Sequence, residues 1–348
     1  MIVCIIAGGS GTRLWPLSTS AYPKHLLKIN GDSKSLLQNT YDRARLTSKD
    51  IYVVTEAGHA HHVKEQLPDV PDKNFIIEPD RRGTASCVVA ALAQISKDHD
   101  RDEPVAIISA DHHVRDHVGF AQSFKIASEA SSAQSRIVMI GIEPDHPATG
   151  FGYIKKDKIF DEDGLVYDAG PFKEKPDYET ALKYFKSGEY LWNCSYLIGS
   201  TNTILERMKL FAPQLAKNFE ELVESKTDKE YVENYLGFEN NSIDFGLLDF
   251  VDDLMVVPAT FDWMDVGAYS DLHKASGADE QGNYISEGNV EVIDVENCYI
   301  ENFEDKPLAV IGLDNVVVIN TKDGILVARK DLGQKVGEVA KRIAKRGE

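Results

Sequence analysis

A glycine-rich loop directly follows the first apolar run of the chain. The run Ile2–Ala7 leads into Gly8-Gly9-Ser10-Gly11-Thr12, and Arg13 comes next. Consecutive glycines let main-chain N–H groups approach an anion closely, because no Cβ intervenes and positive φ angles are open to them. The guanidinium of Arg13 can bind two phosphate oxygens at once. These residues predict a phosphate-binding loop, although a tight turn between a strand and a helix also uses glycines.

The loop matches neither of the two common nucleotide-binding patterns. A dinucleotide fingerprint would need a third glycine where Leu14 stands, and a P-loop would need Gly-Lys-Ser/Thr where the chain has Thr12-Arg13. A second cation, Lys24, follows Pro23 between apolar segments. This position favours a charge that points inward, and the alternative is an ordinary surface lysine.

Short apolar runs alternate with amphipathic segments over the first part of the chain. Runs that are apolar on both faces are typical of buried parallel strands. We predict strands at Ile2–Ala7, Ile51–Val54, Phe75–Ile77, Val105–Ser109 and Ile137–Ile142. We predict helices at Leu36–Leu46, Ala57–Gln66, Thr84–Asp98, Phe120–Ala133 and, further on, Thr201–Phe211. This alternation predicts an α/β fold with a doubly wound, mostly parallel sheet.

Polar clusters follow several of these predicted strands. They are Gly8–Arg13, Glu78–Thr84 and Asp111–His113. In open α/β sheets, ligands bind beyond the carboxyl ends of the strands, so we expect one site at that edge. Alternatively, Asp111 caps a helix and Asp265, which lies shortly before a glycine, forms a turn.

Neither the histidines nor the cysteines form a clear zinc or disulfide pattern. The histidines near the clusters are His59, His61, His62, His112, His113 and His117. Only His113 and His117 have the i, i+4 spacing of two ligands on one helix face. The cysteines are Cys4, Cys87, Cys194 and Cys298, with no C-x-x-C pair. We predict buried, reduced thiols.

The pattern changes from about residue 284. Short alternating runs occur at Val290–Val295, Cys298–Asn302, Leu308–Leu313, Val316–Asn320 and Gly324–Ala328. Such even spacing is typical of a small stacked-strand, β-helix-like unit. Leu332–Lys345 has helical spacing with a basic face, which favours a capping helix over a membrane or partner helix. We predict a first domain over residues 1–275 and a small C-terminal β domain with a terminal helix over residues 284–348.

The charge balance excludes several classes of partner. The chain of 348 residues has 38 Lys and Arg against 56 Asp and Glu, a formal net charge of −18. Nucleic acids and anionic membranes require basic surfaces. The run Ile2–Ala7 is too short for a signal or spanning segment. We predict a cytoplasmic protein that binds no nucleic acid and no membrane, and the sequence allows a homodimer without specifying one.

Several motifs, in order along the chain, resemble those of the sugar-phosphate nucleotidyltransferases. Gly8–Ser18 followed by Pro23–Leu27 resembles the family signature, and Trp15-Pro16-Leu17-Ser18 is similar to its mannose-1-phosphate guanylyltransferase branch. Matching segments follow at Glu78–Ala85, Ala110–His112, Gly150–Ile154, Phe172–Pro176, Trp192–Asn193 and Asp262–Gly267. The resemblance covers residues 3 to about 275, and a left-handed β-helix is the tail that it implies.

The resemblance implies a reaction between two phosphate-bearing substrates. GMP would pass from GTP to mannose 1-phosphate, giving GDP-mannose and pyrophosphate. The nucleophile would be a sugar-phosphate oxygen that is already ionised, so no side-chain nucleophile or base is required. Repulsion is the obstacle, because one like-charge pair about 4 Å apart costs roughly 4 kcal/mol at an effective dielectric near 20. Fixed cations and amide donors would reduce it.

The same resemblance implies a set of site residues. The predicted catalytic residues are Arg13, Lys24, Asp111, Lys175 and Asp265, and Asp111 and Asp265 would hold Mg²⁺, which prefers oxygen ligands. The predicted nucleotide-binding residues are Ala7, Gly8, Gly9, Ser10, Gly11, Thr12, Arg13, Lys24, Glu78, Pro79, Arg82, Thr84, Ala85 and Asp111. The predicted sugar-phosphate-binding residues are Gly150, Gly152, Tyr153, Glu174, Lys175, Asn193 and Asp265.

Two departures from the family pattern keep other functions open. Gly83 stands where Asn is usual, and Cys194-Ser195 stands where Ser-Gly is usual. The first alternative is therefore a transferase for another pair of nucleotide and sugar 1-phosphate. The second is a catalytically silent subunit that senses a nucleotide sugar, and the presence of all five predicted catalytic residues disfavours it.

Overall fold

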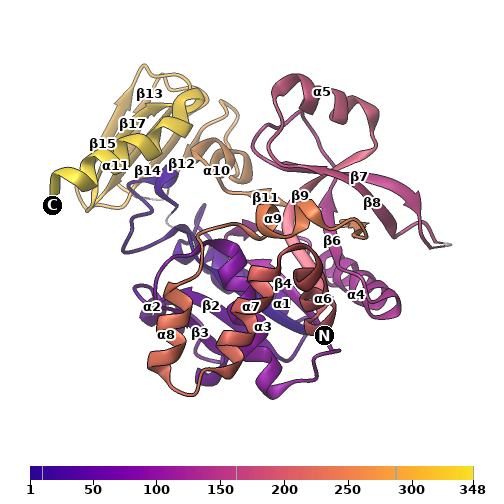
Figure 1. Cartoon of the computed structure of the whole chain (residues 1–348). Helices are drawn as coiled ribbons and strands as arrows, with labels where there is room; N and C mark the ends of the chain where they lie inside the picture. Colours follow the sequence, from indigo (N-terminus) through magenta and orange to yellow (C-terminus); the bar gives the residue numbers. More distant parts are fainter. Residues whose placement is uncertain (10, 162, 287, 348) are drawn as a thin grey trace.

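A nine-stranded sheet organises the larger part of the chain (Figure 1). The computed structural model describes residues 1–9, 11–161, 163–286 and 288–347. The strand order is β3-β2-β1-β4-β9-β6-β10-β8-β7. The strands are β1 (Ile2–Ala7), β2 (Ile51–Glu56), β3 (Phe75–Glu78), β4 (Pro104–Ser109), β6 (Val138–Ile142), β7 (Gly152–Ile159), β8 (Tyr167–Lys173), β9 (Tyr190–Ser200) and β10 (Met255–Pro258).

The sheet has a parallel part and a mixed part. Strands β3, β2, β1 and β4 run parallel, as the sequence predicts for them. Strand β9 is antiparallel to β4, β6 and β7, whereas β10 is parallel to β6. Strands β7 and β8 are also antiparallel to each other, because a short connection joins them in place of a helical crossover. The uninterrupted parallel part therefore ends at β4, and the only parallel pair beyond it among the described strands of this sheet is β6 with β10.

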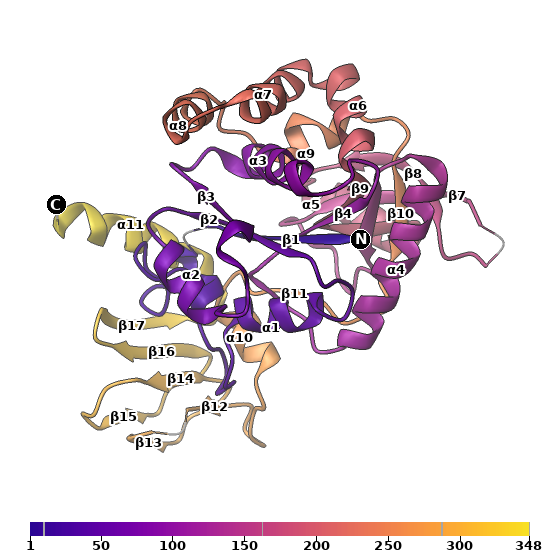
Figure 2. The same cartoon turned by 90° about the horizontal axis from the view of Figure 1, so that it is seen from below.

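Helices cover both faces of this sheet, which confirms the doubly wound α/β fold (Figure 2). One face carries α3 (Gly83–Asp98), α6 (Thr201–Phe211), α7 (Pro213–Glu224) and α8 (Asp228–Leu236), and the other carries α1 (Leu36–Ala44), α2 (Ala60–Gln66) and α4 (His117–Gln134). Alternate residues of β1 enter the two cores, Ile2 and Cys4 on the first face and Val3 and Ile5 on the second. Burial on both faces explains why the strand is apolar throughout.

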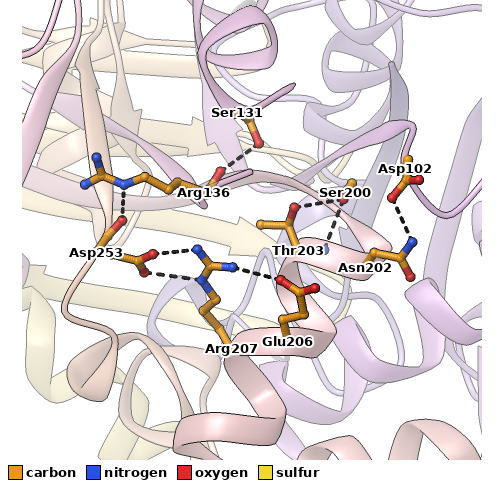
Figure 3. A network of polar contacts seen from close by, with 9 residues as sticks. All are labelled: Asp102, Ser131, Arg136, Ser200, Asn202, Thr203, Glu206, Arg207 and Asp253. Atoms are coloured by element: carbon orange, nitrogen blue, oxygen red, sulfur yellow. Dashed lines mark hydrogen bonds and ion pairs between the residues drawn. The ribbon is translucent and has the colours of Figure 1, made fainter. Parts of the chain in front are cut away.

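A polar network joins helix α6 to the segments that lead into β6 and β10 (Figure 3). Arg207 on α6 forms two contacts with Asp253, at 2.5 and 3.3 Å. Arg136 donates to the main-chain carbonyl of Asp253 at 2.6 Å. Ser200 caps α6 by accepting from the amide of Thr203. Arg136 and Asp253 lie just before β6 and β10, so the network fixes the amino ends of these strands.

The C-terminal part is a stack of short strands, as predicted. They are β12 (Tyr284–Ile285), β13 (Val290–Ile293), β14 (Tyr299–Asn302), β15 (Leu308–Ile311), β16 (Val316–Thr321) and β17 (Gly324–Arg329). Strands β12, β14 and β16 stack in parallel, and so do β13 and β15. Strand β17 turns back antiparallel to β16. The 3₁₀ segment η5 (Lys330–Lys335) and helix α11 (Val336–Gly347) follow, where the sequence predicts a helix.

The strand stack packs directly against the segment that follows the glycine-rich loop. A mixed cluster joins Leu14 and Val266 of the first part to Tyr299 and Val336 of the second. A Cβ at Gly324 would lie 2.5 Å from the ring of Trp15, so the β16–β17 turn has to be glycine there. Short elements complete the chain: η1 (Thr12–Leu14), η2 (Lys24–Leu26), η3 (Asp72–Asn74), β5 (His112–His113), α5 (Tyr178–Ser187), α9 (Ile243–Gly246), η4 (Leu248–Phe250), β11 (Met264–Asp265) and α10 (Tyr269–Ala275).

Two further expectations concern thiols and membranes. All four cysteines are free and buried, as predicted. None of the helices in the described part of the chain is both long and apolar enough to cross a membrane.

Candidate active site

Two aspartates far apart in the sequence meet at one lysine. Strand β11 pairs antiparallel with β5, which places Asp265 opposite His112 and therefore beside Asp111. The ammonium of Lys24, at the start of η2, lies 2.9 Å from Oδ2 of Asp111 and 3.0 Å from Oδ1 of Asp265. Pro23 precedes η2 in an extended conformation and turns Lys24 inward. The prediction of an inward-pointing lysine is confirmed, because only 6% of Lys24 is exposed.

Mutual attraction keeps Lys24 and Asp111 ionised. Burial alone would raise the pKa of Asp111, but the charge of Lys24 outweighs it and holds the pKa below its ordinary value. Burial would lower the pKa of Lys24, but Asp111 and Asp265 together raise it. Asp116, and not Asp111, is the residue that caps helix α4. The helix-cap alternative for Asp111 is therefore wrong.

A cavity of about 260 Å³ lies between the glycine-rich loop and this cluster. Its walls include Gly9, Gly11, Thr12, Arg13, Leu14, Lys24, Arg81, Asp111, Val266 and Gly267. Gly11 has a φ of +54°, and a Cβ there would lie 2.6 Å from the Cβ of Lys24, so only glycine lets the loop pass this close to the lysine. Ser10 lies outside the described residues. We call this space the phosphate cavity.

Two guanidiniums reach the phosphate cavity. Arg13 donates from Nη1 to Oε1 of Gln334 in η5, at 3.2 Å. Arg81 stands 3.3 Å from a carboxylate oxygen of Glu56 through its Nε. Arg81 was not among the residues predicted from the sequence, which favoured its neighbour Arg82. Together with Lys24, the cavity holds three cations for a polyanionic ligand.

A second cavity, of about 150 Å³, adjoins the other side of the aspartate pair. It is lined by His112, Gly150, Phe151, Gly152, Glu174, Lys175, Asn193, Cys194, Ser195, Trp263 and Asp265. The ammonium of Lys175 is 3.0 Å from Oε1 of Glu174. A Cβ at Gly152 would lie 2.4 Å from Oε2 of Glu174, so this glycine makes room for the carboxylate. We call this space the sugar cavity.

The five predicted catalytic residues therefore surround two adjoining cavities. Arg13, Lys24 and Asp111 line the phosphate cavity, whereas Lys175 and Asp265 line the sugar cavity. The Lys24 ammonium contacts a carboxylate from each. The predicted sugar-side residue Tyr153 lies elsewhere: it is fully buried, and its hydroxyl donates to the carbonyl of Ala148 at 2.9 Å. Its role there is packing of the core beneath β7.

Asp244 is a buried acid behind the sugar cavity that the sequence analysis missed. Its Oδ1 accepts from Nδ2 of Asn193 at 2.7 Å, and Oδ1 of Asn193 accepts from the amide of Ser195 at 2.8 Å. Asp244 thereby fixes which way the Asn193 amide points. Burial raises the pKa of Asp244 to about 6. No sequence pattern marks this residue, because α9 is only one turn long.

Asp244→Asn is expected to stabilise the protein at pH 8 but not at pH 4. A raised carboxyl pKa means that the folded state favours the protonated form of Asp244 more than the unfolded state does. The contribution of Asp244 to stability is therefore fully present below the unfolded pKa and is lost as the pH rises through about 6. A rise of the carboxyl pKa from 3.8 to about 6 corresponds to about 2–3 kcal/mol. Urea unfolding at both pH values measures the difference. The exposed Asp252→Asn is the control, and equal effects of Asp244→Asn at both pH values would contradict the prediction.

The predicted base-binding segment is largely occupied by protein partners. Glu78 is buried and its Oε1 contacts the hydroxyl of Tyr235 and the thiol of Cys87. Thr84 accepts from the amide of Ile243 at 2.9 Å. Two further residues of this segment, Arg82 and Ala85, donate to the carbonyls of Leu236 and Asn241, and Arg82 also pairs with Asp80. None of these residues, nor Pro79, lines the two described cavities. Their role in base binding stays a prediction.

The loop at residues 240–241 lies so close to the start of α3 that position 83 has to be glycine. Gly83 has a φ of +77°, and a Cβ there would lie 2.2 Å from the carbonyl oxygen of Asn241. The same Cβ would be 3.0 Å from Oδ1 of Asn240. An asparagine side chain at this position, as in the family pattern, would therefore clash with the main chain of this protein.

Gly83→Asn is expected to destabilise the fold by about 1–3 kcal/mol, from overpacking and from a positive φ. The matched control is Gly58→Ala, because a Cβ at Gly58 meets nothing within 4 Å. Thermal and urea unfolding of both variants checks the result. A Gly83→Asn protein as stable as the parent would show that the 240–241 loop moves aside freely.

No zinc-like cluster supports the histidine alternative. Within residues 1–9, 11–161, 163–286 and 288–347, no group of three or more His, Cys, Asp or Glu side chains is arranged to hold a metal ion. Two of these histidines contact other parts of the protein: His59 contacts the carbonyl of Ser20 at 2.7 Å, and His112 contacts the hydroxyl of Tyr196 at 2.9 Å.

Comparison with known proteins agrees with this geometry. Residues 2–282 match the family model described as nucleotidyl transferase, and residues 288–343 match the mannose-phosphate isomerase/GMP-like β-helix domain. The chain is 34% identical to mannose-1-phosphate guanylyltransferase RfbM of Salmonella typhimurium strain LT2, over 96% of this chain and 71% of that protein. It is 34% identical to xanthan biosynthesis protein XanB of Xanthomonas campestris pv. campestris strain ATCC 33913, over 99% and 73%. A crystal structure from Thermus thermophilus, described as mannose-1-phosphate geranyltransferase, superposes with a TM-score of 0.89 at 28% identity, over 99% of each chain.

The fold and the two cavities thus belong to a nucleotidyltransferase, an enzyme of the transferase class. Its motifs from the glycine-rich loop to Asp262–Gly267 lie in the order that the sequence resemblance implies. The chain belongs to the mannose-1-phosphate guanylyltransferase family.

Proposed function

We propose that the protein transfers GMP from GTP to mannose 1-phosphate, giving GDP-mannose and pyrophosphate. The observation that carries the proposal is the Asp111–Lys24–Asp265 cluster between a cation-lined cavity and a cavity lined by hydrogen-bonding groups. Such an arrangement suits two anions that must meet at one point. The names of the relatives supply the choice of GTP and mannose 1-phosphate.

In the proposed reaction, an oxygen of the sugar phosphate attacks the α-phosphorus of GTP. The bond from this phosphorus to the bridging oxygen breaks, and pyrophosphate leaves with the electron pair, so no proton has to move. Arg13 and Arg81 neutralise the leaving pyrophosphate, with the amides of Gly9, Gly11 and Thr12 as further donors. Lys175 holds the sugar phosphate. Positioning and charge neutralisation supply the acceleration.

Sugar hydroxyls would bind to the groups around the second cavity. Glu174 accepts hydrogen bonds, and Asn193, oriented by Asp244, can donate and accept. Ser195 adds a hydroxyl where the family pattern has glycine, at a φ of +57°. This extra donor is the specific observation that favours the first alternative, a related sugar 1-phosphate.

Asp111 and Asp265 fit a Mg²⁺ site that substrate phosphates and water complete. Mg²⁺ is usually held by one or two carboxylates together with substrate phosphates, and the described chain offers this pair and no further acidic ligand beside it. When bound, the ion would supply Lewis-acid stabilisation of the phosphate charge. In its absence Lys24 neutralises both carboxylates.

The test is pyrophosphate release over a matrix of GTP, ATP, UTP and TTP against several hexose 1-phosphates, with Mg²⁺ and with EDTA. We expect the highest kcat/KM for GTP with mannose 1-phosphate, and no release with EDTA. A preference for UTP or TTP would establish the first alternative. Binding of GTP without release of pyrophosphate for any pair would establish the sensing subunit.

A further inference from the structure

A cavity larger than either of the two cavities described above lies outside the proposed active site. Its volume is about 640 Å³, against about 260 Å³ for the phosphate cavity. Its walls come from helix α10, from the corner residues Asn297 and Asn315 of the strand stack, and from segment η5. It is therefore formed only when the C-terminal strands pack against the first part of the chain.

Lys330 is held in this cavity by neutral partners. Its ammonium lies 2.8 Å from Nδ1 of His273 and 2.6 Å from Oδ1 of Asn297. Its main-chain amide donates to the carbonyl of Asn315 at 3.0 Å. An ammonium has three N–H donors, so two are used by uncharged acceptors and the third is left for another ligand. Lys330 forms no ion pair with any residue of the described chain.

Asp314 attracts Lys330 without forming an ion pair with it, and Lys274, Asp331 and Asp279 are the other charged groups around the cavity. Lys274 also lines it and has no ion-pair partner among the residues the structure covers. Asp331 lines it as well, but its carboxylate is engaged by Arg329 at 2.6 and 2.9 Å. Asp279 accepts from the amides of Gln281 and Asn283. Lys330 and Lys274 are thus two lysines on one cavity wall that no ion pair engages, and together they attract anions locally.

We propose that this cavity binds the phosphate group of a small phosphorylated metabolite through Lys330 and Lys274, and that the bound anion is an effector of the phosphate cavity. A lysine ammonium with a free donor, fixed by neutral neighbours, is a suitable partner for a phosphate oxygen. The size of the cavity leaves room for a sugar or similar group beside the phosphate. The binding step is independent of the proposed function, and the effector step rests on it.

The two cavities share structural elements. Gln334 lines the large cavity and accepts from Arg13, which lines the phosphate cavity. Ala268 lines the large cavity, and its neighbour Gly267 lines the phosphate cavity. A ligand that shifts η5 therefore shifts the hydrogen-bond partner of Arg13, and we expect it to change the affinity for the nucleotide.

The binding step is tested by NMR on the full chain with ¹⁵N-labelled histidine, and His273→Gln assigns the His273 imidazole signal. The probes are orthophosphate and glucose 6-phosphate, which bears no phosphate at the anomeric carbon. We expect a saturable shift of the His273 signal.

Lys330→Gln and Lys274→Gln should each weaken binding roughly tenfold, the effect of losing one charge-assisted hydrogen bond. Lys274 is exposed and unbonded, so its variant tests the site even if Lys330→Gln fails to fold. The exposed Lys49→Gln is the charge-matched control and should bind as the parent does.

The possible results distinguish the binding step, the effector step and the proposed function from one another. A response to orthophosphate alone identifies free phosphate as the ligand, and a stronger response to glucose 6-phosphate identifies a phosphate ester. No saturable shift with either probe, or equal affinity in the parent and both cavity variants, would overturn the site.

For the effector step, the probe should change the KM for GTP by about fivefold in the parent and not in Lys274→Gln. A saturable shift with an unchanged KM overturns the effector role. A saturable shift without any pyrophosphate release refutes the proposed function and leaves the site standing.

Discussion

Asp111→Asn is expected to lower kcat about a thousandfold while the fold stays close to that of the parent. Asparagine keeps the shape of the side chain but removes one of the two carboxylates proposed to hold Mg²⁺. Lewis-acid stabilisation is worth several kcal/mol, and about 4 kcal/mol corresponds to a factor of a thousand in rate. Lys24 retains Asp265 as a partner at 3.0 Å, so no buried charge is left alone. Steady-state pyrophosphate release over a range of Mg²⁺ concentrations measures the effect.

Asp262→Asn is the matched control for this experiment. Asp262 lies three residues before Asp265 in the same motif, but its carboxylate accepts from the amides of Arg115 and Asp116 and pairs with the Arg115 side chain. It lines neither of the two described cavities, and its variant should keep a normal dependence on Mg²⁺. Unchanged turnover in Asp111→Asn would remove this residue from the metal role. Equal losses in both variants would indicate a structural defect of the segment and not a chemical one.

Lys24→Met is expected to destabilise the protein by about 3–5 kcal/mol and to make its stability depend on Mg²⁺. The variant leaves Asp111 and Asp265 facing each other without their shared cation, and removing one partner of a buried ion pair costs about this much. A divalent cation can replace the lost charge, because the carboxylates remain. Urea unfolding with EDTA and with Mg²⁺ measures both effects. The parent should gain far less from Mg²⁺ than the variant.

Lys28→Met is the control, because Lys28 belongs to the same segment but is exposed. A surface substitution of this kind should change stability by less than about 0.5 kcal/mol. If Lys24→Met were as stable as Lys28→Met in EDTA, the two aspartates would not need the lysine. If Mg²⁺ stabilised both variants equally, the ion would bind elsewhere.

Much of the fold follows from local sequence pattern. Strand β1 and helix α6 occupy the predicted residues, Ile2–Ala7 and Thr201–Phe211. Strand β1 is apolar on both faces, and α6 starts at a Ser200 cap and ends before Pro213, so each carries its own start and stop signals. Strand β8, in contrast, was missed, because Gly170 and Pro171 within it are typical of turns. Pairing with β7 and β10 overrides that local preference.

The site residues likewise divide into those that local sequence predicts and those that depend on tertiary structure. Residue chemistry and the family resemblance together predicted the glycine-rich loop, the inward lysine and both aspartates, because these lie in short motifs. The sequence analysis predicted Arg82 as a nucleotide-binding residue and missed its neighbour Arg81, which lines the phosphate cavity. The structure turns Arg81 toward the cavity and Arg82 toward Leu236 and Asp80, since the path of the chain after β3 sets the direction of each.

The sequence by itself therefore determined the family, the strand–helix alternation and the types of group that we propose to contact the phosphates, all of which lie in short contiguous segments. Only the tertiary structure decided that Asp265 lies beside Asp111, through the pairing of β11 with β5. It also decided that Asp244 orients Asn193 and that the C-terminal stack encloses a third, lysine-lined cavity. These contacts join residues far apart in the chain, and their geometry depends on how whole layers pack, which no local pattern encodes.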